Sequence, residues 1–117
     1  MYGKNKRIKE LISDLKDLSR EEDVKIWRDI AERLKKPTKN YSEVNLSKIN
    51  RNSKEGDEII VPGKVLGSGQ ITKEITIASL SFSETAEQKI KQRNGNPLTI
   101  EELMKENPQG TEVKIIG

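Results

Sequence analysis

The stretch VPGKVLGSGQITKEITIASLSFS, residues 61–83, decides the fold class, because a glycine-rich segment leads directly into a strand-like run. In that run, EITIASLSF at 74–82, both alternating sets of side chains are apolar or small. Such a strand is covered on both faces, which predicts an α/β protein instead of a one-sided sheet. The β-branched runs EIIVPG at 58–63 and VKIIG at 113–117 predict two more strands.

The three glycines of this stretch do not match a nucleotide-binding loop. A Walker A loop needs G-x-x-x-x-G-K-[ST] followed by a helix, whereas Gly63, Gly67 and Gly69 have other spacings and lead into a strand. A dinucleotide fingerprint fails because its third glycine is missing. Glycine also allows a close approach of backbone and a positive φ, so we expect a tight surface loop. The neighbouring backbone is either the protein's own or that of a nucleic acid.

Two helices are predicted before this stretch. Residues 5–18 carry apolar side chains at helical spacing, and the same pattern returns up to Pro37. Ser19 and Glu22 are interpreted as the capping box that begins the second helix, so the pair predicts an antiparallel hairpin. Trp27 lies on the apolar stripe of the second helix, which favours a place in the core over a role as a stacking platform for a base.

Two further helices are predicted after it. Ser83 is expected to cap a helix in SETAEQKIKQR, residues 83–93. Thr99 and Glu102 are expected to form a capping box for a short helix that ends before Pro108. The predicted order of the second half is therefore strand, glycine loop, strand, helix, helix, strand.

The composition narrows the class of function. The chain has 117 residues, enough for one domain, with 32% hydrophobic and 35% charged residues, so we expect a thin core and a highly charged surface. The absence of cysteine and histidine excludes disulfides and the usual zinc sites, and it removes the commonest general base. An enzyme is therefore not expected, nor is a cofactor. No apolar run approaches the ~18 residues that span a membrane.

Positive charge is concentrated in one part of the chain. The net charge is only +3, but residues 35–54 contain six basic residues against Glu43 alone. This segment is expected to be a loop with a short helix near 47–52. Such a basic patch is expected of a phosphate-binding face, although a solvated lysine-rich loop would have the same composition.

Five motifs together resemble a known family. EVNLSKINR, VPGKVLGSGQITK, IASLSFSETAEQKI, LTIEELMKENPQG and VKIIG, in this order and spacing, closely resemble the ribosomal protein L18e family, the archaeal and eukaryotic relatives of bacterial ribosomal protein L15. The resemblance covers residues 41–117, and the helical hairpin also looks like the archaeal form. One departure is visible, since the family usually ends its main helix with a glycine pair where this chain has Asn94 and Gly95. Asparagine tolerates a left-handed turn.

The resemblance implies a structural component of the large ribosomal subunit, cytoplasmic and without catalytic activity. It implies large-subunit ribosomal RNA and neighbouring ribosomal proteins as partners. It also implies a core built as an irregular superhelix of β-β-α turns. We accordingly expect one L18e-like domain over 1–117, made of the hairpin (1–36), a basic RNA-facing segment (37–58) and an α/β core (59–117).

The candidate RNA-binding residues come mainly from the basic segment and the glycine loop. The expected phosphate contacts are Lys35, Lys36, Lys39, Lys48, Arg51, Lys64 and Lys73. Asn45 and Ser47 are expected to donate hydrogen bonds to sugar or phosphate, and Gly67 and Gly69 to shape the loop. With only 3% aromatic residues, recognition of RNA shape and backbone is expected over base stacking. The alternative is a protein-binding adaptor that uses an exposed apolar face of the hairpin.

Overall fold

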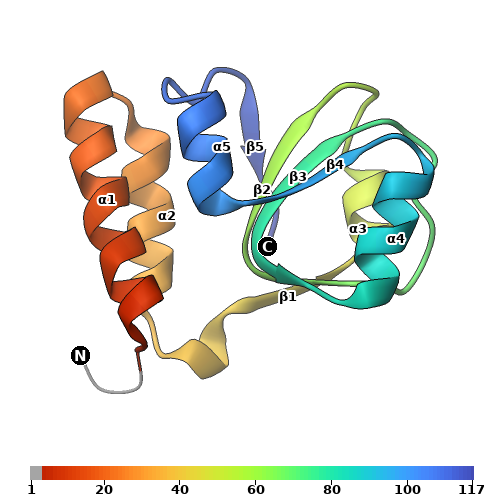
Figure 1. Ribbon diagram of the computed structural model, residues 1–117, viewed down its shortest axis with the longest axis horizontal. Helices are drawn as coiled ribbons and strands as arrows, with labels where there is room; N and C mark the ends of the chain where they lie inside the picture. The colour runs from red at the N-terminus through yellow and green to blue at the C-terminus, as the bar shows by residue number, and fades with distance from the viewer. Residues whose placement is uncertain (1–3) are drawn as a thin grey trace.

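The computed structural model describes residues 4–117, which fold as a helical hairpin followed by a parallel α/β unit (Figure 1). This confirms the predicted fold class. Residues 1–3 of the predicted hairpin segment lie outside the described residues. The elements, in chain order, are α1 (Lys6–Glu22), α2 (Lys25–Lys35), the 3-10 turn η1 (Thr38–Asn40), β1 (Ser42–Asn45), α3 (Leu46–Arg51), β2 (Glu58–Leu66), β3 (Thr76–Phe82), α4 (Glu84–Gln92), β4 (Asn96–Thr99), α5 (Ile100–Glu106) and β5 (Val113–Ile115).

The first helix is longer than predicted. Asn5 caps α1 by accepting a hydrogen bond from the Ile8 amide at 2.9 Å, and the helix ends only at Asp23, which is left-handed with φ 56°. The predicted capping box at Ser19 is wrong. The Ser19 hydroxyl donates to the Val24 carbonyl inside the turn, and α2 begins at Lys25. Arginine and glutamate are good helix formers, so the residues after Ser19 extend α1.

The apolar stripes of both helices are buried against the rest of the protein. Trp27 is fully buried, as predicted from its spacing, and its Nε1 donates to the Pro108 carbonyl at 2.6 Å. The hairpin stripe packs against α5 and one face of the sheet. The adaptor alternative expected this stripe to be exposed, and it is not. Within residues 4–117, no helix is both long and apolar enough to cross a membrane.

Strand β2 is the centre of the sheet, and every pairing among the described strands is parallel. Strand β3 occupies one edge of β2. Strands β1 and β5 share the other edge, with β1 beside residues 63–66 and β5 beside residues 58–60. Each connection therefore returns the chain to the same end of the sheet. The chain winds in successive turns, in agreement with the superhelix that the resemblance implied.

Two strands were not predicted. Strand β1 lies in the segment expected to be a loop, just before the short helix α3 that was expected there, and β4 lies between α4 and α5. Their sequences, SEVN and NPLT, are short and mostly polar. Each becomes a strand by pairing its backbone with a longer neighbour, and local propensity gives no sign of such pairing.

The sheet is covered on both faces, as the run 74–82 predicted. Ile60 and Ala78 face the hairpin and α5, while Ile59 and Ile77 face α3 and α4. In Figure 1, α1, α2 and α5 accordingly lie on one side of the sheet, and α3 and α4 lie on the other. The alternation follows from the period of two along a strand. Charged side chains on the hairpin and on α3 therefore belong to opposite sides of the molecule.

One glycine and one asparagine have a clear structural reason. Gly63 was expected in a loop, but it lies inside β2, where an added β-carbon would be 1.9 Å from the Ser42 carbonyl oxygen of β1. The two strands can pair there only because the side chain is absent. At the end of α4, Asn94 takes the left-handed conformation, φ 62°, as expected for the departure from the family's glycine pair.

Candidate nucleic-acid interface

Most of the predicted cations are free of acidic partners. Seven ion pairs within 4.0 Å are found among residues 4–117, and they leave out Lys36, Lys39, Lys48, Arg51 and Lys64. All five of these side chains are exposed. Their charges face water, so an incoming phosphate would find them without first displacing a carboxylate.

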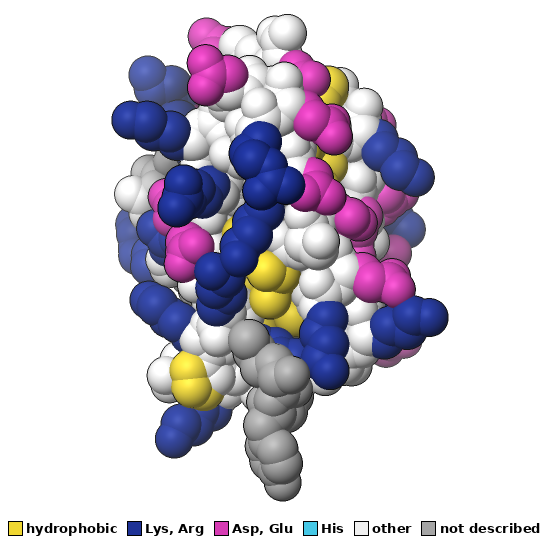
Figure 2. All heavy atoms as spheres, turned by 90° about the vertical axis from the view of Figure 1, so that its left-hand side faces the viewer, with side chains coloured by type: hydrophobic (Ala, Val, Ile, Leu, Met, Phe, Trp, Pro, Cys, Tyr) yellow, Lys and Arg dark blue, Asp and Glu magenta, His cyan; other side chains and the backbone are white. Residues whose placement is uncertain are grey.

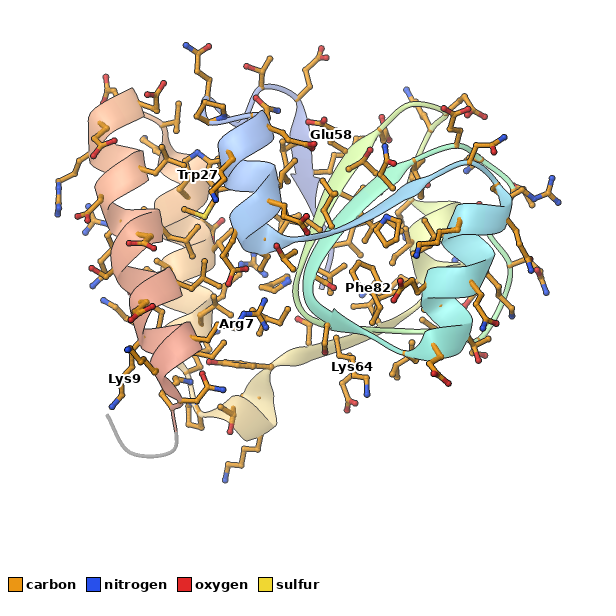
Figure 3. All side chains as sticks on the ribbon, in the orientation of Figure 1. Arg7, Lys9, Trp27, Glu58, Lys64 and Phe82 are labelled. Atoms are coloured by element: carbon orange, nitrogen blue, oxygen red, sulfur yellow. The ribbon has the colours of Figure 1, made fainter. Side chains whose placement is uncertain are left out.

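Lys39 and Lys64 come together across η1 and β2. Both line a hollow of about 340 Å³, together with the hydroxyl-bearing residues Thr38, Ser42 and Ser81 and one acidic residue, Glu43. Figure 3 shows Lys64 pointing outward below the sheet. The hollow thus combines two ammonium groups with hydroxyl groups, which are the groups that bind phosphate oxygens.

Helix α3 presents a second pair of cations. Lys48 and Arg51 are three positions apart and exposed, while Leu46 and Ile49 anchor the helix in the core. Asn45 precedes α3 as its N-cap residue, and its exposed side chain makes no capping hydrogen bond. This amide is therefore available to a ligand. Lys36 is exposed at the end of α2, and its backbone carbonyl accepts a hydrogen bond from the Lys4 ammonium.

Two of the lysines that were predicted to contact phosphate bind groups of the protein itself. The Lys73 ammonium is half-buried and donates to the carbonyls of Asn50 and Ser53, the latter at 2.6 Å. It joins the end of α3 to the segment before β3. Lys35 lies on the hairpin, on the other side of the sheet from α3, and its ammonium is 3.1 Å from Glu32 Oε1. The structure does not bring these two lysines together with Lys48 and Arg51.

The loop after β2 is fastened to its own chain. An added β-carbon at Gly67 would be 2.7 Å from Thr85 Cβ, and one at Gly69, where φ is +93°, would be 2.6 Å from Ser47 Cβ. The sequence left open whether these glycines lie against the protein's own chain or against a nucleic acid. They lie against the protein's own chain. Ser47 also supports the loop, because its amide donates to the Ser68 carbonyl at 3.1 Å.

Lys89 holds the same loop, although the sequence suggested no role for it. Its ammonium donates to the carbonyls of Gly67 and Gly69, at 2.9 and 2.8 Å. The only sequence signal is its place beside Ala86 and Ile90, on the flank of the buried stripe of α4. This lysine is half-buried and has a structural function.

Seven acidic side chains form ion pairs among residues 4–117. The pKa of Glu101 is lowered by its hydrogen bond to Arg7, that of Asp57 by Lys114 and that of Glu32 by Lys35. A general acid needs the opposite shift. In the part of the chain that the structure describes, no group of three His, Cys, Asp or Glu side chains could hold a metal ion.

Comparison with known protein families gives a match over almost the whole chain. The family described as ribosomal protein 60S L18 and 50S L18e matches residues 2–117. The chain belongs to this family, which confirms the resemblance stated from the five motifs. It is therefore a structural ribosomal protein and not an enzyme.

Individual relatives are similar over almost the whole chain. The large ribosomal subunit protein eL18 of Methanoregula boonei is 54% identical, covering 96% of this chain and 93% of its own length. The eL18 of Methanospirillum hungatei is 53% identical with the same coverage. The eL18 of Halobacterium salinarum is 43% identical and covers 94% of both chains. These relatives are archaeal, as the sequence suggested.

Proposed function

We propose that the protein binds large-subunit ribosomal RNA through one basic face, called here the α3 face. It consists of the free cations and polar groups around α3 and the carboxyl ends of β1 and β2, and the loop after β2 shapes it. Its members are Asn45, Ser47, Lys48, Arg51, Gly67 and Gly69. Lys36, at the end of α2, and Lys39 and Lys64, in the hollow beside Tyr41 and Leu80, are further proposed phosphate contacts outside the α3 face. As in its relatives, which are named as proteins of the large subunit, the working place is the ribosome in the cytoplasm, beside neighbouring ribosomal proteins.

The observation that carries this proposal is the contrast between free and paired cations. Lys91 and Lys114 are neutralised by carboxylates at 2.8 and 2.9 Å, whereas Lys48, Arg51 and Lys64 make no ion pair among residues 4–117. Several unpaired cations on one face repel each other, and a polyanion relieves that repulsion. RNA phosphates supply such a polyanion, and the displaced counterions add to the affinity.

The arrangement favours recognition of RNA backbone and shape. The proposed contacts are lysines, an arginine, one amide, one hydroxyl and two glycines, without an aromatic platform among them. Groups of this kind contact phosphate and sugar and fix the position of a protein on folded RNA. Lys35 is left out of the α3 face because it lies on the hairpin, on the other side of the sheet, and Lys73 because its ammonium binds two backbone carbonyls.

The test compares two charge-reversal variants of equal charge. Lys48→Glu with Arg51→Glu changes the α3 face, while Lys91→Glu with Lys105→Glu changes exposed lysines of α4 and α5. Binding of each to deproteinised archaeal large-subunit rRNA is measured by filter retention over a range of salt concentrations. The α3 variant is expected to bind at least tenfold more weakly, with a salt slope smaller by roughly 1.5, since two phosphate contacts are lost.

The control variant is expected to keep the parent's salt slope. Circular dichroism and thermal melting of each variant establish that it is folded. If the folded α3 variant binds with the same affinity and slope as the control, the α3 face does not contact RNA. If the parent protein shows no salt-dependent binding to rRNA, the protein does not bind RNA through phosphate contacts at all.

A further inference from the structure

The outer surface of the helical hairpin separates its charges into two bands. Along α1, the cations Lys9, Lys16 and Arg20 follow each other at spacings of seven and four residues, which places them on one flank. The acids Glu10, Asp14, Asp17 and Glu21 occupy the opposite flank at spacings of four, three and four residues. Figure 2 shows the result on this face, a band of Lys and Arg side chains beside a band of Asp and Glu. Figure 3 shows Lys9 pointing away from the body of the molecule.

The basic band continues onto the second helix and encloses a hollow. Between α1 and α2 a hollow of about 280 Å³ is lined by four cations, with Glu32 as the only acid and Ser19 as the only neutral residue. The four cations are Lys16, Arg20, Arg28 and Lys35. This groove is called here the hairpin groove. The charges of two of its cations are partly neutralised, because Arg20 pairs with Asp17 and Lys35 pairs with Glu32.

Like charges are held close together in the hairpin groove. The neighbouring Lys35 ammonium lowers the pKa of Lys16, and Arg28 contributes in the same direction. Two neighbouring ammonium groups repel each other unless an anion lies between them. Folding has brought together side chains that are far apart in the sequence, and the hydrophobic stripes beneath them fix the helices in that position. The cations of the hairpin groove are therefore held close together in the free protein, in positions where they can bind an anion.

We propose that the hairpin groove is a second RNA backbone-binding surface, so that one molecule holds two separate RNA segments on opposite sides of its sheet. This inference rests on the proposed function, because it assumes that rRNA is the partner of the α3 face. The hairpin packs on the face of the sheet that includes Ile60, and α3 packs on the face that includes Ile59. A single RNA strand would have to wrap around the molecule to reach both.

The lining of the hairpin groove favours RNA over an acidic protein segment. Protein interfaces are anchored by buried apolar or aromatic side chains, and the groove presents only cations, Glu32 and Ser19. A phosphate chain needs no such anchor. It is also extended, as the basic band is, and the adjacent acidic band would repel it from the other flank of α1. The two bands together define the path of a polyanion along the hairpin.

The first test uses footprints on the RNA. Hydroxyl-radical cleavage of deproteinised archaeal large-subunit rRNA is compared with and without the parent protein, the α3 variant (Lys48→Glu with Arg51→Glu) and a hairpin variant (Lys16→Glu with Arg28→Glu). The parent is expected to protect two sets of nucleotides. The hairpin variant should lose one set and keep the other, and the α3 variant should do the reverse. Each variant should reduce the salt slope by roughly 1.5.

The second test needs no variant and so does not depend on the folding of one. The parent protein is acylated at its lysines with and without rRNA, and the modified residues are identified by mass spectrometry. Lys16 and Lys35 are expected to be protected by rRNA at least fivefold, while Lys91 and Lys105 stay equally reactive. Protection of Lys48 in the same experiment reports on the α3 face separately.

The outcomes distinguish the two proposals. If Lys48 is protected and the lysines of the hairpin groove are not, the α3 face binds RNA and the inference about the groove is wrong. If both variants lose the same nucleotides, there is one RNA segment and not two. If Lys16 and Lys35 are protected only in intact large subunits and not by rRNA alone, the occupant is a neighbouring protein, and the inference is again wrong. If no lysine and no nucleotide is protected, the proposed function itself fails.

Discussion

The Arg7 guanidinium of α1 holds the Glu101 carboxylate of α5 with two hydrogen bonds, 2.8 Å from Nε to Oε2 and 3.1 Å from Nη2 to Oε1. A third donor of the same group, Nη1, reaches the Leu80 carbonyl of β3 at 2.9 Å. Figure 3 shows Arg7 directed from α1 toward the sheet. One side chain thus joins the hairpin to α5 and to the sheet.

This contact predicts a loss of stability in acid. Hydrogen bonding to Arg7 lowers the pKa of Glu101 below its ordinary value of 4.5. A carboxylate whose pKa is lowered by folding stabilises the protein above its unfolded pKa, and this contribution is lost as the pH falls through the folded pKa. Glu101→Gln should therefore reduce the free energy of unfolding by about 1 kcal/mol at neutral pH, a value discounted because the pair is partly exposed.

Urea unfolding of both proteins at neutral pH and in acid checks this prediction. The difference between parent and Glu101→Gln should shrink as the pH falls below the folded pKa of Glu101, where the parent has lost the same interaction. Glu106→Gln, a change in an exposed residue of the same helix, should have little effect at either pH. A difference that stays constant with pH would show that charge is not what Glu101 contributes.

The fluorescence of Trp27 is expected to report on the contact between the hairpin and the turn after α5. Its indole is fully buried and bonded to the Pro108 carbonyl at 2.6 Å, so emission from this single tryptophan should be blue-shifted and unchanged by RNA. Trp27→Phe leaves a cavity and an unpaired carbonyl, which should reduce the free energy of unfolding by about 2–3 kcal/mol. Water-like emission in the free protein, quenched by RNA, would place Trp27 at the interface instead.

Alanine substitutions at three glycines can separate the effect of backbone strain from that of crowding. Gly56→Ala meets a positive φ of 85° with no atom within 4 Å, Gly67→Ala meets Thr85 at an ordinary φ, and Gly69→Ala meets both obstacles. Thermal melting should therefore show the largest loss for Gly69→Ala, about 2 kcal/mol or more, against about 1 kcal/mol for Gly56→Ala. If Gly69→Ala melts like the parent but binds rRNA more weakly, RNA and not Ser47 is the close neighbour of this glycine.

Two lysines of the predicted site should behave in opposite ways. Lys73→Met removes an ammonium that binds two carbonyls, so the free energy of unfolding should fall by about 2 kcal/mol while the salt slope of RNA binding stays unchanged. Lys64→Met removes an exposed cation, so stability should stay within about 0.5 kcal/mol while the slope falls by roughly 0.8. If the two changes reduce the salt slope equally, Lys73 also contacts RNA and the prediction is wrong.

Short-range patterns in the sequence were enough for most of the architecture. The Thr99 hydroxyl accepts from the Glu102 amide, and the Glu102 carboxylate accepts from the Thr99 amide, as their spacing predicted. The burial of Trp27 and the covering of both faces of β3 follow from periodicity. In each case the deciding contacts lie within a few residues, or depend only on which side of an element is apolar. The family, too, could be recognised from the order of five motifs.

The role of individual lysines and glycines was decided by tertiary structure alone. Nothing near Lys73 in the sequence indicates that its ammonium binds the Asn50 carbonyl, and nothing near Gly63 indicates the Ser42 carbonyl. Strand β1 exists because β2 offers it a free edge. Lys16 and Lys35 lie on different helices and meet only because the hairpin closes. A lysine has the same charge whether it is free, paired or buried against carbonyls, so only the packing of distant segments determines which lysines can bind RNA.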